Sequence, residues 1–133
     1  MEAIRVSSDV IVYTFSFLEA GLRLKANKAE ICKFFYKMSQ ENKFKDLLEV
    51  LVFDTTSCYP YSDSVFEAID RLTGSSFVST IDLEVYEITE ALTEKDVGEI
   101  FSGEECELLK ELAERFSIGI EAYFPSWHNK YKS

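Results

Sequence analysis

Histidine is almost absent from this sequence, and its scarcity limits the catalytic chemistry that the chain can perform. The only histidine is His128. A Ser-His-Asp or Cys-His site would therefore depend on His128, because the base must accept the proton of the nucleophile. The chain also has no G-x-S-x-G, Walker A or G-x-G-x-x-G motif. We therefore predict a non-catalytic protein with no cofactor, and a small enzyme of unknown class stays an alternative.

Cysteine is scarce as well, and its spacing argues against a metal site or a disulfide framework. The three cysteines are Cys32, Cys58 and Cys106. An odd number of cysteines without any C-x-x-C pair fits neither a zinc site nor a set of structural disulfides. Reduced cysteines are typical of the cytoplasm, so the sequence predicts a cytoplasmic protein without a metal.

Linkers and long apolar runs are also missing. The chain contains only two prolines, Pro60 and Pro125, and no stretch rich in Gly, Ser and Pro divides it, so its 133 residues predict one domain. No apolar run approaches the roughly 18 residues of a membrane-spanning helix. The most apolar stretch, residues 10–18, lies between Asp9 and Glu19. It has no strongly basic leader and no small-residue cleavage site, which argues against a signal peptide.

Negative charge is abundant, and it is concentrated in the second part of the chain. The net formal charge is −10. Residues 1–53 hold 7 acidic and 8 basic side chains, whereas residues 54–133 hold 17 acidic and 6 basic ones. An acidic surface repels nucleic acid and attracts basic proteins. The charge pattern therefore favours a basic protein partner.

Apolar periodicity predicts a mainly α fold with one small β-hairpin. Ser7 or Ser8 is expected to begin a first helix, although its β-branched residues would also suit a strand. Asn27 and Glu30 form a capping-box pattern before a second helix. Further helices are predicted over residues 44–53 and 62–73, after Thr93, and after Ser102 or Gly103, with the hairpin over residues 77–88.

These elements suggest a single-domain helical bundle in three parts. Residues 1–53 form a near-neutral helical part, residues 54–121 an acidic helix–hairpin–helix part, and residues 122–133 an aromatic tail. The order of helix, helix and two-stranded hairpin within residues 44–88 is also the order of a winged-helix domain. Both arrangements remain open at this point.

Two segments resemble a known family. The run YPYSDSVFEAIDRL (residues 59–72) is similar to the GPxS–LxxAIxxL helix starts of Panacea antitoxin-like proteins, which occur in bacterial toxin–antitoxin and phage-defence operons. The run GEECELLKELAERF (residues 103–116) and a tail with Trp127 and His128 resemble later parts of those proteins. Tyr59 stands where the family has Gly. The resemblance implies a protein that neutralises or contacts another protein.

The expected partner-binding residues combine the acidic half with exposed aromatic side chains. Carboxylates spaced by three or four residues share one helix face, and aromatic residues are common in interface cores. We therefore predict that a basic partner is bound by Glu84, Glu87, Glu90, Glu104, Glu107, Glu111, Tyr123 and Trp127. The alternatives are an ordinary solvated face or, with two carboxylates, a site for a hard cation. A homo-oligomer also remains open.

A nucleic-acid-binding regulator is the second functional hypothesis, because it would follow from a winged-helix order. The helix that would enter a groove carries Asp63, Glu67 and Asp70 against Arg71 alone, and phosphates would repel these carboxylates. A weak basic cluster elsewhere, either an anion-contacting surface or a solvated helix face, consists of Lys25, Lys28, Lys33, Lys37, Lys43 and Lys45.

Overall fold

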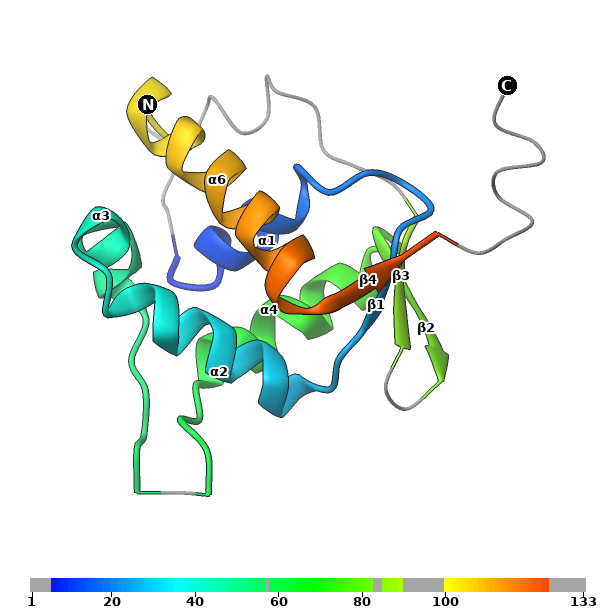
Figure 1. Cartoon of the computed structure of the whole chain (residues 1–133), viewed down its shortest axis with the longest axis horizontal. Helices are drawn as coiled ribbons and strands as arrows, with labels where there is room; N and C mark the ends of the chain where they lie inside the picture. Colours follow the sequence, from blue (N-terminus) through cyan, green and yellow to red (C-terminus); the bar gives the residue numbers. More distant parts are fainter. Residues whose placement is uncertain (1–5, 57, 83–84, 90–99, 125–133) are drawn as a thin grey trace.

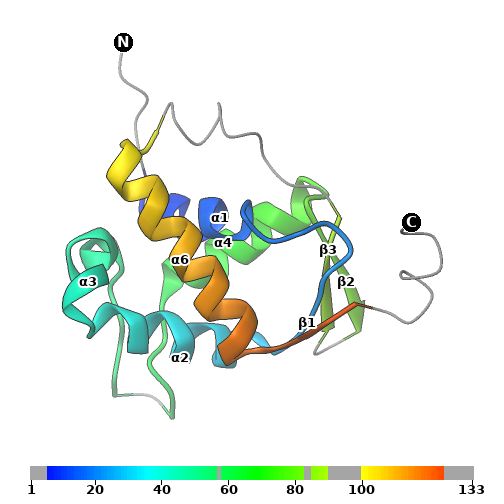
Figure 2. The ribbon, with the colours of Figure 1, turned by 45° about the horizontal axis from the view of Figure 1, so that its top comes forward.

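The structure is a computed structural model, which describes residues 6–56, 58–82, 85–89 and 100–124 (Figure 1). The elements follow the order α1 (Asp9–Phe15), β1 (Arg23–Lys25), α2 (Lys28–Ser39), α3 (Asn42–Lys45), a 3-10 helix η1 (Leu47–Val50), α4 (Asp63–Gly74), β2 (Val78–Asp82), β3 (Val85–Ile88), α6 (Gly103–Gly119) and β4 (Glu121–Tyr123). The helices gather at one end of the molecule and the sheet lies at the other (Figures 1 and 2). The helix expected after Thr93 lies outside the described residues.

Two helices begin at reciprocal capping boxes, which explains where they start. The Asn27 side chain accepts a hydrogen bond from the Glu30 backbone N–H, and the Asn27 backbone N–H donates to the Glu30 carboxylate. Ser102 and Glu105 form the same arrangement at the start of α6. Each box satisfies backbone donors that a helix start leaves free. The sequence prediction of both starts is confirmed.

The first segment is a helix, which resolves the helix-or-strand alternative. Helix α1 begins at Asp9 and contacts both α4 and α6. It is buried nearly all round, and this explains why its sequence has no single apolar face. The Asp9 carboxylate lies inside with it and accepts a hydrogen bond from Arg71 of α4 at 2.8 Å.

The β-structure is more extensive than a single hairpin, so that part of the prediction is wrong. Strands β2 and β3 do form the expected antiparallel pair, but β1 and β4 extend it into a four-stranded sheet of order β2-β3-β1-β4. Leu24 of β1 lies opposite Tyr86 of β3 on one side and Ala122 of β4 on the other. Residues 122 and 123, assigned to the aromatic tail, therefore belong to a strand.

The predicted helix over residues 44–53 is shorter than expected and begins earlier. It consists of α3 and η1, and Leu51, directly after η1, has an extended backbone conformation. Val52, which a helix over residues 44–53 would include, is 79% exposed. The β-branched Val50 and Val52 disfavour a continued helix, because branching at Cβ restricts side-chain rotamers there. Phe53 instead packs its ring against Tyr36 of α2.

The centre of the core is a group of aromatic rings shared by three helices. The Phe116 ring of α6 lies 5.1 Å from that of Phe15 in α1 and 5.0 Å from that of Phe34 in α2, between ring centroids. The loop aromatics Tyr59 and Tyr61 also fold back, since Tyr61 packs against Phe66 of α4. These two tyrosines therefore serve local packing.

Within the described parts of the chain, no helix is both long enough and apolar enough to cross a membrane.

Candidate functional site

The outer face of α6 carries a row of carboxylates. Glu104, Glu107, Glu111 and Glu114 follow one another at intervals of three or four residues, which places them on one side of a helix with 3.6 residues per turn. The opposite side packs Leu109, Leu112, Ala113 and Phe116 into the core. Burial of that side fixes the rotation of the helix and turns the carboxylates outward, with α6 lying over α1 (Figure 2).

The row has an exposed apolar residue at its C-terminal end. Ile118, four positions after Glu114, is 85% exposed and continues the same side of α6. We call Glu104, Glu107, Glu111, Glu114 and Ile118 together the α6 face. Mixed acidic and apolar character suits contact with a basic, partly apolar protein surface.

Two carboxylates of the α6 face form ion pairs within the chain. Glu111 contacts the Lys43 ammonium at 2.5 Å, and Glu107 lies 3.6 Å from that of Lys110. Glu104 and Glu114 are exposed, and the structure gives neither an ion pair within the residues it describes. The Glu107–Lys110 pair is exposed, and exposed pairs contribute little to stability, so exchanging Lys110 for an external base costs little. Glu111 is half-buried, and one of its carboxylate oxygens is shielded from solvent.

Of the other five residues predicted to bind a partner, two lie on strands of the sheet and three lie outside the described residues. Glu87 of β3 contacts the Arg23 guanidinium at 3.0 Å, and Tyr123 lies opposite Arg23 on β4. The hydrogen bond to Glu87 is the main cause that raises the pKa of Arg23, and Tyr123 adds to it. These two predicted residues therefore meet at Arg23, away from the α6 face. Glu84, Glu90 and Trp127 lie outside the described residues.

Bases from the near-neutral part of the sequence meet acids from the acidic part. Besides Lys43–Glu111 and Arg23–Glu87, Lys25 lies 3.9 Å from Glu121, and Lys28 lies 3.6 Å from Asp70. The uneven distribution of charge along the chain is thus partly balanced inside the fold. Sequence reasoning missed these pairs because spacing in the chain says nothing about contacts between distant segments.

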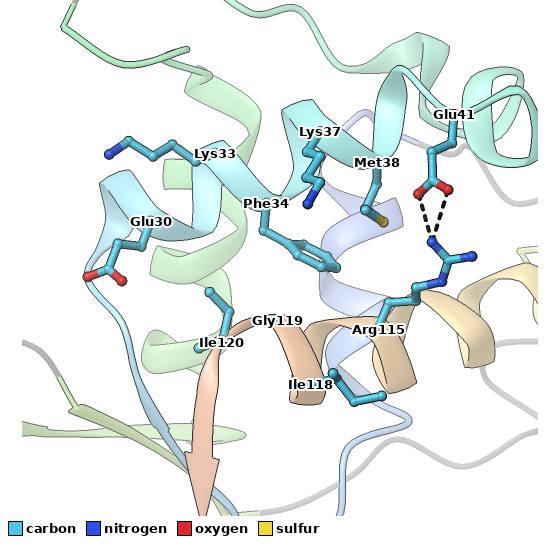
Figure 3. A pocket seen from close by; sticks show the side chains of 10 residues that line it. All are labelled: Glu30, Lys33, Phe34, Lys37, Met38, Glu41, Arg115, Ile118, Gly119 and Ile120. Carbon is cyan, nitrogen blue, oxygen red and sulfur yellow. Dashed lines mark hydrogen bonds and ion pairs between the residues drawn. The ribbon is translucent and has the colours of Figure 1, made fainter.

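A second surface, unpredicted as a site, is an open groove between α2 and the end of α6 (Figure 3). Its volume is about 570 Å³, and it adjoins the α6 face at Ile118. Phe34 and Met38 contribute apolar surface, and Lys33 and Lys37 line it from α2. The sequence did contain one signal for this groove. Lys33 and Lys37 are four residues apart on either side of Phe34, and both belong to the weak basic cluster.

The titratable groups of the core do not form a reactive cluster. Burial raises the pKa of the Cys32 thiol above its ordinary value of 9.0 and that of the Tyr86 hydroxyl above 10.0. Both groups are therefore held in their neutral forms. In the described ranges, no three His, Cys, Asp or Glu side chains lie close enough to hold a metal ion.

Comparisons with protein-family models, with curated proteins and with solved structures found no match for this chain.

Proposed function

We propose that this chain is a non-catalytic, cytoplasmic protein-interaction module that binds a basic partner through the α6 face. The observation that carries the proposal is the row of four carboxylates ending at the exposed Ile118 on one side of a helix. A helix packed on its other side presents such a row with little loss of conformational freedom on binding. The chain's net charge of −10 adds a long-range attraction for a basic surface.

An antitoxin or immunity-type role is the specific form of this proposal. Such proteins block a basic enzyme, and opposite fields accelerate the encounter. The resemblance of residues 59–72 and 103–116 to Panacea antitoxin-like proteins supports this form. The order of α4 followed by the hairpin β2–β3 is also that of a winged-helix domain, which would favour a nucleic-acid-binding regulator instead. On α4 itself, the exposed Asp63, Glu67 and Asp70 would repel phosphates, which argues against DNA reading.

The test compares two variants with the same change in net charge. The first, Glu104→Gln/Glu107→Gln/Glu114→Gln, neutralises the α6 face. The second, Asp46→Asn/Glu49→Gln/Glu67→Gln, neutralises exposed acids on other elements. Each is used in a nuclease-treated pull-down from host lysate at about 50 mM and about 500 mM salt, conditions that weaken exposed electrostatic contacts progressively.

We expect a stoichiometric basic protein that elutes at high salt, is lost with the first variant and is retained by the second. Equal loss with both variants would show attraction by net charge alone and contradict a specific face. Recovery of nucleic acid that disappears after nuclease treatment would contradict the proposal in favour of a nucleic-acid-binding regulator.

A further inference from the structure

The groove between α2 and α6 has an apolar floor and one fully open side (Figure 3). Phe34, Met38 and Ile120 form the floor and are themselves largely buried. Ile118 forms the α6 wall and is 85% exposed. An exposed isoleucine beside a buried apolar floor leaves apolar surface in water, which a ligand of matching character would cover.

Some of the charged side chains that line the groove have partners within the described part of the fold, and others do not. Glu30 belongs to the capping box of α2, and the Glu41 carboxylate accepts two hydrogen bonds from Arg115, at 2.8 and 3.0 Å. Lys33 and Lys37 are exposed and one turn apart, and the described structure gives neither an ion pair. Two like charges at this spacing repel each other slightly, so an anion between them would be favoured.

This contrast specifies the charge of an occupant. Of the ten basic side chains that the structure describes, seven form ion pairs within the fold: Arg23, Lys25, Lys28, Lys43, Arg71, Lys110 and Arg115. Lys45, which has no ion pair among the described residues either, lies on α3 and does not line the groove. Lys33 and Lys37 instead remain available directly beside the apolar floor. The complementary ligand is therefore anionic on one flank and apolar on the adjacent side.

The shape of the groove favours a peptide helix over a small molecule. Small-molecule sites usually enclose most of their ligand, whereas the Ile118 wall leaves this groove open. The lining residues of α2 run from Glu30 to Met38, and Glu41 follows beyond the end of this helix. At 1.5 Å per residue the α2 part is about 12 Å, or slightly more than two helical turns. A groove of this length accepts one face of a short amphipathic helix, as in other helix-in-groove complexes.

We infer that this groove binds a short amphipathic helix of a partner protein, with apolar residues on the floor and Asp or Glu side chains against Lys33 and Lys37. The site is separate from the carboxylates of the α6 face and selects the opposite charge. The chain thus carries two neighbouring surfaces that recognise different chemistry.

The experiment selects ligands from a displayed library of random 14-residue peptides, using the full chain as bait. We expect enriched peptides with large apolar residues at i, i+3 or i+4 and i+7, and with Asp or Glu on one flank. A labelled synthetic peptide of the enriched family is then titrated by fluorescence anisotropy.

Matched variants locate the binding. Lys33→Gln/Lys37→Gln and Ile118→Ser are each expected to weaken binding at least tenfold. The control Lys28→Gln/Lys45→Gln removes the same charge from outside the groove and is expected to change the Kd less than twofold. The α6 triple variant used above should also leave the Kd unchanged, which separates this inference from the proposed function. Circular dichroism verifies that every variant is folded.

Several results would overturn the inference. They are the absence of any enriched family, enrichment of basic peptides, or equal weakening by the control variant. A dimer in light scattering that dissociates on Lys33→Gln/Lys37→Gln would assign the groove to a second copy. Binding of dodecanoate that requires both lysines, without any selected peptide, would assign it to a small amphiphile.

Discussion

The Cys32 thiol is fully buried on α2, and this residue gives the fold a predictable response to alkaline pH. Burial raises the pKa of this thiol in the folded protein above the ordinary value of 9.0, which an unfolded cysteine keeps. Above that pH the unfolded state loses a proton that the folded state retains. The free energy of unfolding therefore falls as pH rises, by at most about 1.4 kcal/mol per pH unit for this group.

We predict that Cys32→Ala makes the decline in stability between about pH 9 and 10 shallower. Urea unfolding at a series of pH values measures the slope, which is separate from the stability lost by removing a buried side chain. Cys58→Ala is the control, because the Cys58 thiol is exposed. An unchanged slope in Cys32→Ala would contradict the role of Cys32 and assign the alkaline loss to other groups with raised pKa values, such as Tyr86 or Tyr61.

Single residues also show where sequence reasoning was sufficient and where it was not. Asn27, and Ser102 or Gly103, were predicted as caps because a cap depends on residues only a few positions away in the chain. Arg23, by contrast, joins Glu87 and Tyr123 only because three strands come together. No local sequence pattern predicts that these three side chains come together.

At the scale of the element, the end of α6 differs from the turn before β1. Gly119 ends α6 without a positive φ, and a Cβ there would meet the Phe34 ring at 3.6 Å, an ordinary contact. Gly21 has φ 96°, and its N–H donates to the Ile88 carbonyl at 2.6 Å. Alanine suits the first conformation and is strained in the second.

We predict that Gly119→Ala raises the free energy of unfolding by about 0.5–1 kcal/mol, while Gly21→Ala lowers it by about 1 kcal/mol or more. Thermal and urea unfolding of both variants measure the difference. Destabilisation by Gly119→Ala would contradict the described end of α6. Neutral behaviour of Gly21→Ala would contradict the positive φ at that turn.

The elements predicted correctly are those with long periodic patterns. Helices α2, α4 and α6 have repeated apolar spacing over several turns, so their existence follows from the sequence. Strands β1 and β4 have three residues each, too few to show an alternation. They are strands because each has a partner in the sheet, and their pairing depends on the whole fold.

At the scale of the whole molecule, the aromatic core joins α1, α2 and α6 around Phe116. Its ring is fully buried, and it also lies 6.1 Å from that of Phe35, between centroids. Removing it leaves a cavity bordered by three helices that cannot all move inward.

We predict that Phe116→Ala lowers the free energy of unfolding by about 3–5 kcal/mol, a large part of a domain's stability. Chemical denaturation provides the measurement. Phe66→Ala is the matched control, because that ring is only partly buried, and it should cost clearly less. Similar losses in both variants would contradict a core centred on Phe116.

The acidic surface was predictable in part from the whole sequence. Net charge and its concentration in the second half can be counted, and helical spacing placed Glu104, Glu107 and Glu111 on one face. The same spacing could not show that Lys43 pairs with Glu111, nor that α2 and α6 enclose a groove. Those features arise from the packing of distant segments.

The central position of β1 in the sheet also determines when the chain can fold on the ribosome. Leu24 pairs with Tyr86 and Ala122, so both neighbours of this early strand are synthesised much later. The rings of Phe15 in α1 and Phe34 in α2 likewise lack a packing partner until Phe116 has been synthesised. Such distant pairing slows folding and prolongs exposure of apolar segments. Apolar segments of the nascent chain therefore remain without their native partners until α6 and β4 have been synthesised.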